Sequence, residues 1–288
     1  MKPNLLILPL IFSALACSPK PPPLAQPPAD YSSDPDVQAL VERMLSDAQA
    51  NLGSATARRS LGLAYAANDL WIPARDCFRA ALELDPKDLE SRYQLAVAFG
   101  EAGDLPAKVQ TLEALIADQP DYSPAVYLLA VEYLDQGQLD RAQPLFERVA
   151  RNLPEMPHGL MGLGELALAR DESVQAARQL EKAYQLAPMD TYIGFLLGQA
   201  YLGQGRESEA QPLLALGSTQ GRPRLNPKST VEMRSYRVSR SARLSEAVAS
   251  LKKKDYAAAV SVLEDLHRKD PKDTTCLNNL AIAYLGTN

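Results

Sequence analysis

Apolar residues recur at helical spacing through most of the chain after residue 54, in paired runs rich in Leu, Ala and Tyr. Each pair ends in a proline, and Pro86, Pro120, Pro154 and Pro188 stand 34 residues apart. Proline ends a helix because it lacks an N–H and disfavours helical geometry in the residue before it. The pattern therefore predicts a stack of antiparallel helix pairs, and such a solenoid presents an extended binding surface.

The register of the prolines divides the chain. Complete units are expected at 55–88, 89–122, 123–156 and 157–190, and a fifth begins at 191. After Leu216 the pattern breaks at a Gly- and Ser-containing stretch that predicts a loop. We therefore expect a capping helix within 37–54, five repeats over 55–216, an interrupting segment at 217–239, and a sixth repeat with the first helix of a seventh over 240–288.

Within each unit, the first predicted helix has a large apolar, a small and an aromatic residue in that order. The second has a small, an apolar and another small residue, and the proline follows. The first unit has Leu61, Gly62, Tyr65, Ala74, Phe78, Ala81 and Pro86, and the third has Leu129, Ala130, Tyr133, Ala142, Phe146, Val149 and Pro154. This pattern resembles the tetratricopeptide repeat. The resemblance implies an all-α, right-handed superhelical solenoid of antiparallel helix pairs that binds proteins.

The resemblance also implies that the first helix of each pair faces a concave groove. The side chains that would line it are mostly apolar or aromatic: Arg59, Leu63, Tyr93, Gln94, Val97, Tyr127, Leu128, Val131, Leu134, Met161, Glu165, Leu168, Tyr192, Phe195, Gln199, Leu202 and, in the last helix, Asn279. Such a groove would accept a partner helix or extended segment. The alternative is that these residues pack between neighbouring repeats, or, for Asn279, lie on an exposed terminal helix.

The N-terminus has the features of an export signal. Met1 and Lys2 precede an apolar run from Leu5 to Ala16, which is too short to span a bilayer. The run ends in Ser-Ala-Leu-Ala-Cys, which resembles the lipobox of bacterial lipoproteins and predicts a signal peptide over 1–16 and lipidation of Cys17. The same residues satisfy the A-x-A rule of a simply secreted protein. The lipoprotein resemblance implies an outer-membrane anchor facing the periplasm.

Prolines dominate the stretch from 17 to 36, which is expected to be an extended linker. At ~3.1 Å per residue, this linker could hold the folded part up to about 60 Å from the lipid.

Charge is distributed unevenly. The net charge of −5 and pI of about 5.3 give no general attraction to nucleic acid. The stretch 217–254 nevertheless carries a net charge of +8. Its arginines are Arg222, Arg224, Arg234, Arg237, Arg240 and Arg243, the last four at three-residue spacing. They form either a solvated helix face or a contact site for anionic lipid, cell-wall glycan or an acidic partner.

Residue types that carry catalysis are sparse. His158 and His267 lie in different repeats without metal-ligand spacing, and no phosphate-binding loop or nucleophile motif is present. Cys77 and Cys276 are expected to be buried and too far apart for a disulfide. The sequence predicts a protein without catalytic activity, metal or cofactor. We expect an envelope adaptor supporting assembly of an envelope, secretion or pilus complex, with binding of anionic lipid or glycan as the alternative.

Overall fold

The computed structural model describes residues 21–215, 217 and 221–287. Within these ranges all regular secondary structure is helical, which confirms the predicted fold class. The helices are α1 (Pro35–Ala50), α2 (Ala55–Ala67), α3 (Trp71–Leu84), α4 (Leu89–Glu101), α5 (Leu105–Asp118), α6 (Ser123–Asp135), α7 (Leu139–Asn152), α8 (His158–Ala169), α9 (Ser173–Leu186), α10 (Thr191–Gly203), α11 (Glu207–Ala215), α12 (Lys228–Met233), the 3₁₀ helix η1 (Arg234–Tyr236), α13 (Arg240–Lys252), α14 (Tyr256–Lys269) and α15 (Thr274–Thr287).

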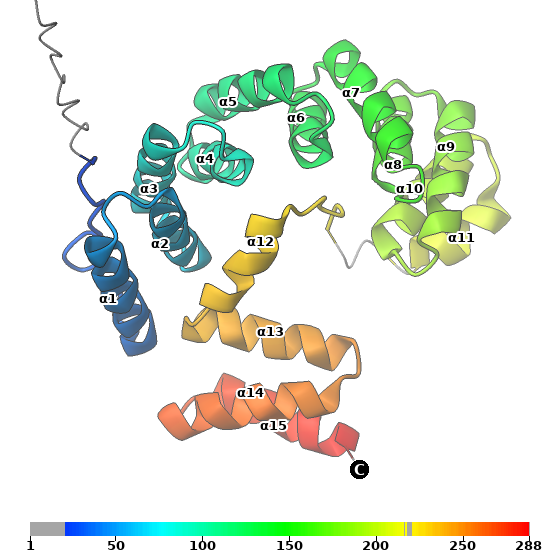
Figure 1. The fold of residues 1–288 in the computed structure, drawn as a ribbon. Helices are drawn as coiled ribbons and strands as arrows, with labels where there is room; N and C mark the ends of the chain where they lie inside the picture. Colours follow the sequence, from blue (N-terminus) through cyan, green and yellow to red (C-terminus); the bar gives the residue numbers. More distant parts are fainter. Residues whose placement is uncertain (1–20, 216, 218–220, 288) are drawn as a thin grey trace, which may run out of the picture.

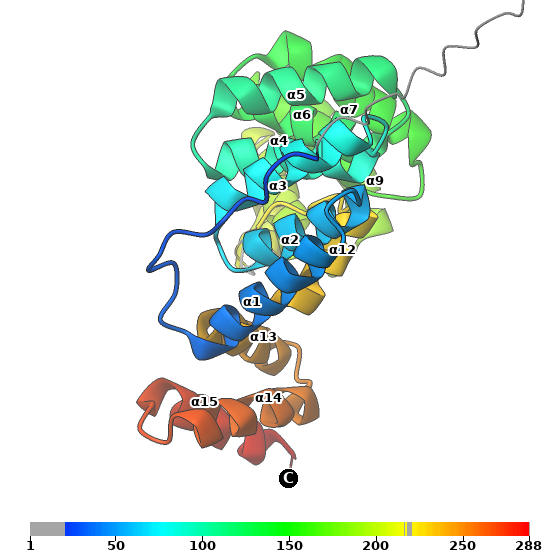
Figure 2. The same ribbon diagram turned by 60° about the vertical axis from the view of Figure 1, so that its left-hand side comes forward.

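Helices α2 to α11 form five antiparallel pairs that follow one another along a curved array (Figure 1). The four regularly spaced prolines fall in the connections between pairs, where the sequence pattern places them. Helix α1 lies against α2 at the start of the array and buries Val37, Leu40, Val41, Met44 and Ala48 there (Figure 2). The array therefore begins with a single helix that covers the first repeat.

A left-handed residue in the turn between paired helices provides a second 34-residue period. Asp69, Gly103, Gly137, Asp171 and Gly205 all have φ between 58° and 85°, and Lys254 takes the same conformation in the sixth repeat. Glycine adopts this conformation without the clash that a Cβ introduces, and aspartate tolerates it better than most residues. This backbone reversal brings the second helix of each pair against the first.

Small residues let the paired helices approach closely. A Cβ added at Gly62 would lie 2.7 Å from a ring carbon of Phe78, and one at Gly164 would lie 2.4 Å from Cγ of Leu180. Both partner side chains are fully buried. The alternation of small and large residues that identifies the repeat is thus the packing contact within each pair.

The proline-rich linker is not a free spacer along its whole length. Arg58 is 1% exposed and donates hydrogen bonds to the carbonyl oxygens of Pro22 and Pro23 at 2.5 and 2.8 Å. Tyr65 donates to the carbonyl of Ala25 at 3.1 Å. Residues 22–25 therefore lie on the first repeat, which corrects the expectation of a spacer up to about 60 Å long.

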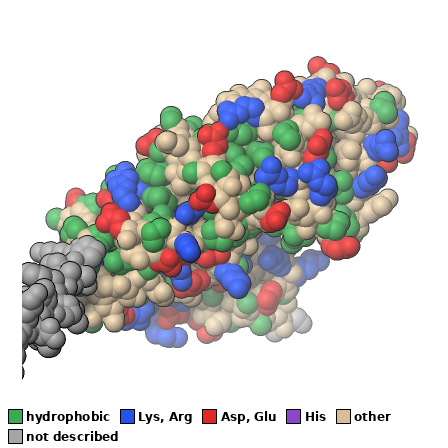
Figure 3. Space-filling model, turned by 45° about the horizontal axis from the view of Figure 1, so that its top comes forward, with side chains coloured by type: hydrophobic (Ala, Val, Ile, Leu, Met, Phe, Trp, Pro, Cys, Tyr) green, Lys and Arg blue, Asp and Glu red, His purple; other side chains and the backbone are tan. Residues whose placement is uncertain are grey.

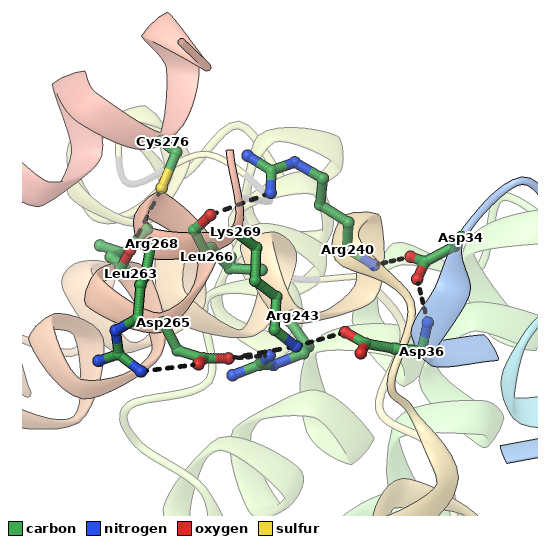
Figure 4. A network of polar contacts seen from close by, with 10 residues as sticks. All are labelled: Asp34, Asp36, Arg240, Arg243, Leu263, Asp265, Leu266, Arg268, Lys269 and Cys276. Carbon is green, nitrogen blue, oxygen red and sulfur yellow. Dashed lines mark hydrogen bonds and ion pairs between the residues drawn. The ribbon is translucent and has the colours of Figure 1, made fainter. Parts of the chain in front are cut away.

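Helices α13, α14 and α15 form a C-terminal module with its own hydrophobic core, which includes Ala247, Leu263, Leu266, Cys276 and Leu280. Polar contacts connect this module to the start of the chain (Figure 4). The backbone N–H of Arg240 donates to Asp34 at 2.7 Å, and Lys269 pairs with Asp36 at 2.6 Å. The start of α1 thus contacts the first residue of α13 and the last residue of α14.

Lys254 offers a test of the left-handed turn. Replacing Lys254 by Gly should raise the free energy of unfolding by about 1 kcal/mol, because the Cβ of a left-handed residue is unfavourable by roughly that amount. The matched control is Lys253→Gly, since Lys253 has φ of −81° and loses the same charge. Urea unfolding followed by circular dichroism should show stabilisation only for K254G, and equal effects of the two variants would contradict the argument.

The concave groove as candidate functional site

Residues 222–236, here called the groove segment, cross the inside of the arc formed by the helix pairs (Figure 1). The segment is extended up to residue 227 and continues as α12 and η1. It contacts α6 and α8 first, then α4, and finally α2, so it runs opposite to the order of the repeats. The sequence predicted a groove open to a partner; the structure instead fills much of it with the chain's own interrupting segment.

Arg222 enters the groove between two acidic side chains. Its Nε lies 3.0 and 3.2 Å from the two carboxylate oxygens of Glu165, and its terminal nitrogens lie 3.1 and 3.0 Å from Asp135. Tyr192 also donates a hydrogen bond to Glu165. A planar guanidinium suits this site because it can donate to two carboxylates at once.

Burial makes Glu165 dependent on a cation. Its side chain is only 7% exposed, and burial raises the pKa of Glu165, while Arg222 and Tyr192 offset part of that increase. For Arg222, burial lowers the pKa, but hydrogen bonds and charge from Asp135 and Glu165 more than offset this and raise it. A buried carboxylate without a cation would be costly to keep ionised. This part of the groove therefore selects a positively charged ligand group.

Next along the segment, aromatic residues hold the backbone. The hydroxyl of Tyr127 donates to the carbonyl of Pro223 at 2.7 Å, and the buried imidazole of His158 lies near the backbone of Arg224. The rings of Tyr127 and His158 meet edge to face, with centroids 5.2 Å apart. Leu225 joins the hydrophobic cluster of the central repeats. These contacts bind backbone groups and one apolar side chain of the segment.

Helix α12 is held by two polar side chains of α4. Gln94 donates from Nε2 to the hydroxyls of Ser229 and Thr230 at 2.9 and 3.0 Å. Glu90 accepts the backbone N–H of Ser229 at 2.7 Å. Gln94 and Ser229 are each 1% exposed, so their hydrogen bond is shielded from water. The groove recognises the start of this helix through hydroxyl and amide groups.

The last part of the segment reaches the first repeat. Met233 joins the buried cluster that contains Leu63, and Asn68 donates to the carbonyl of Tyr236 at 2.9 Å. The Asn68 side chain also accepts the backbone N–H of Ser239 at 3.3 Å. Asn68, Glu90 and Asp135 were not among the residues predicted from the repeat register, because they lie at helix ends or beside the expected groove positions.

The other expected groove residues have different surroundings. Tyr93 and Met161 are buried, and Val97, Leu128, Val131, Leu134 and Leu168 are partly buried against the central hydrophobic cluster. Arg59 pairs with Asp88 at 2.6 Å, between the first two repeats. Asn279 donates to the carbonyl of Thr275 on its own helix, in the C-terminal module. On α10, Phe195 is half-buried, whereas Gln199 and Leu202 are exposed.

The arginines of the interrupting segment do not form one continuous helix face. Arg234 lies in η1, Arg237 follows it, and α13 begins at Arg240, which corrects the expectation of a single helix. Arg240 pairs with Asp273 and Arg243 with Asp265, each at 2.5 Å. Arg224, Arg234 and Arg237 are exposed. Half of the expected basic patch is thus engaged with acidic residues of the same chain.

On the face shown in Figure 3, basic and acidic side chains are interspersed with hydrophobic ones.

In the described part of the chain, no cluster of three or more His, Cys, Asp and Glu residues is arranged to hold a metal ion. None of the described helices is both long and apolar enough to cross a membrane. Cys77 and Cys276 are buried free thiols. Cys17 and the expected signal peptide lie outside the described residues.

Two sequence profiles, both described as tetratricopeptide repeat, match residues 127–191 and 90–122. Residues 90–122 and 127–191 of this chain are therefore tetratricopeptide repeats. Among curated proteins, it is 29% identical over 130 residues to interferon-induced protein with tetratricopeptide repeats 2 of Mus musculus, and 29% identical over 123 residues to cellulose synthase operon protein C of Pseudomonas fluorescens. Each match covers 43% of this chain but only 27% and 10%, respectively, of the relative.

Solved structures of the family share the fold. PilF of Pseudomonas aeruginosa matches with a TM-score of 0.53 and 17% identity, over 79% of this chain and 96% of PilF. MamA of Desulfovibrio magneticus matches with a TM-score of 0.52 and 19% identity, over 58% of this chain and 96% of the MamA chain. Tetratricopeptide repeat proteins act as protein-interaction scaffolds, and the groove contacts are of the kind that such a scaffold uses.

His158 should make stability depend on pH. Burial lowers the pKa of His158 below its ordinary value of 6.5, and the Arg224 backbone and Asp190 offset only part of this. The unfolded chain then binds a proton where the folded chain does not, so the free energy of unfolding falls as pH drops through 6.5.

The variant His158→Gln should lose less stability than the wild type between pH 7.5 and 5.5. Urea titrations at both pH values measure the difference. An identical loss in the two proteins would show that His158 does not contribute.

Proposed function

We propose that this protein is a non-enzymatic adaptor of the bacterial envelope whose concave groove binds a helix or extended segment of another envelope protein. One observation carries the proposal: the groove already binds residues 222–236, which are extended and then helical. Side chains of α4, α6 and α8, and of Asn68 directly after α2, make these contacts. A surface with this arrangement of a carboxylate pair, aromatic donors and an amide recognises peptides rather than small substrates.

In this proposal the adaptor is attached to the outer membrane through lipidated Cys17 and faces the periplasm. The support comes from the lipobox-like residues and the proline-rich stretch after them. Since residues 22–25 lie on the first repeat, only five peptide steps separate Cys17 from the fold. At roughly 3.5 Å per residue, the anchor would hold the first repeat within about 17 Å of the lipid.

The role we favour is support of a larger envelope, secretion or pilus assembly. A similar protein from Pseudomonas fluorescens carries the name cellulose synthase operon protein C, and a solenoid can hold several components of an assembly along its length. Binding of anionic lipid or cell-wall glycan has less support, because Arg222, Arg240 and Arg243 already pair with carboxylates.

Replacing Cys17 by Ser tests the anchor. Without the thiol no lipid can be attached, and a single acylated residue is the proposed membrane contact, so the C17S chain should move from the membrane fraction to the soluble periplasmic fraction. Cell fractionation and immunoblotting measure this, with Cys77→Ser as the control because Cys77 is buried in the fold. Continued membrane association of C17S would refute the anchor.

Crosslinking from the uncovered end of the groove tests the adaptor. A photo-crosslinking residue at Leu202, which is 47% exposed on α10, should capture a defined exported protein in cells. The same residue at Ile72, 61% exposed on α3, is the control for exposed apolar positions outside the first helices. Phe195→Ala should weaken the Leu202 crosslink severalfold without changing the melting temperature. Equal capture at both positions, or no capture, would contradict the proposal.

A further inference from the structure

The groove segment is built like a bound ligand rather than like part of the scaffold. It lies outside the 34-residue register, and among the described helices none forms with α12 an antiparallel pair like those of the repeats. Its buried residues Leu225, Ser229 and Met233 face the groove, while Arg224, Asn226, Lys228, Val231 and Arg234 are exposed. One side of the segment contacts the protein and the other contacts solvent, so it can leave without opening a repeat.

The hydrophobic contacts of the segment are also divided. Leu225 joins the cluster of the central repeats and Met233 joins the cluster of the first repeats, and both clusters consist mainly of scaffold residues. The specific contacts are instead polar: Arg222 with Asp135 and Glu165, and Ser229 with Gln94. Polar contacts of this kind set specificity and register, and water or another ligand can replace them.

We propose that the groove segment is an intramolecular competitive ligand that covers the partner site until a partner peptide of the same chemistry displaces it. This inference rests on the proposed function, because it concerns the same groove. The partner peptide carries a basic residue for Asp135 and Glu165, an apolar residue three positions later, and then a short helix. That helix begins with hydroxyl side chains for Gln94 and has an apolar residue four positions after the first of them.

Tethering explains why modest contacts are sufficient for this role. A segment linked to its own site has an effective concentration in the millimolar range, so even weak binding keeps the groove covered. The apparent affinity for a free peptide is then reduced in proportion to the fraction of chains whose groove is open. Weakening the segment alone should raise that fraction while leaving the groove side chains unchanged.

A synthetic peptide of residues 221–237 with a fluorescent label provides the probe, and fluorescence anisotropy measures its binding to the full chain. Arg222→Glu places a carboxylate beside Asp135 and Glu165 and should release the segment by repulsion. The R222E chain should bind the wild-type peptide at least tenfold more tightly than the wild-type chain does. Arg234→Glu makes the same charge change at an exposed position and should bind like the wild type.

A peptide carrying the R222E change should bind neither chain, since the groove requires a cation there. If the R222E chain keeps its helicity and melting temperature but binds the wild-type peptide no better than the wild-type chain, the proposal is wrong. A wild-type dimer that R222E converts to monomers in light scattering would mean that the segment lies in a second copy, which also overturns the intramolecular assignment.

Hydrogen exchange of the wild-type chain gives a second measurement that needs no variant. Backbone amides of the groove segment should exchange faster than those of α6 and α8, because the segment opens while the scaffold stays folded. Exchange of all three at one rate would show that the segment leaves only on global unfolding. Since the peptide belongs to this chain, these results do not depend on an external partner, and crosslinking from Leu202 can fail or succeed independently.

Discussion

Close contact between the two helices of each repeat is the constraint on which the rest of the structure depends. Gly62 against Phe78 and Gly164 against Leu180 leave no room for a Cβ, so the helix axes are set by these contacts. The left-handed residue between the paired helices reverses the direction of the chain, so the second helix packs against the first. Repetition of this unit curves the array and turns the first helices α2, α4, α6 and α8 toward a shared groove (Figure 1).

Curvature has an electrostatic consequence. It brings Asp135 of α6 and Glu165 of α8 close enough to share one guanidinium, although they are separated in sequence by most of a repeat. Glu165 is shielded from water, and such a carboxylate is stable as an anion only with a cation beside it. The groove is therefore more selective than an apolar surface, and Arg222 satisfies its requirement within the same chain.

The C-terminal module follows a different principle. Its apolar core is separate from the main array, and its contacts with α1 are hydrogen bonds and ion pairs between partly exposed groups (Figure 4). Exposed ion pairs contribute little stability individually and weaken with salt. The module is therefore joined to the array mainly through the groove segment, so the covering of the groove and the position of the module are linked.

The repeat register was readable in the sequence because helix packing within a pair is local. Gly62 and Phe78, or Gly164 and Leu180, are 16 residues apart, and the same spacing recurs along the chain. The positions of Gln94, Tyr127 and Glu165 on first helices followed from that register. The docking of Pro22 and Pro23 on Arg58 did not, because it joins residues about 35 apart through backbone groups.

The sequence by itself determined the fold class and the 34-residue register of the helix pairs, since both follow from short-range periodicity. Only the tertiary structure decided what occupies the groove. Contacts such as Gln94 with Ser229, 135 residues apart, depend on the path of the chain after the fifth repeat, and no local pattern encodes that path. The opposite charges of Arg222 and the Asp135–Glu165 pair were visible in the sequence, but their meeting depends on the curvature of the assembled array.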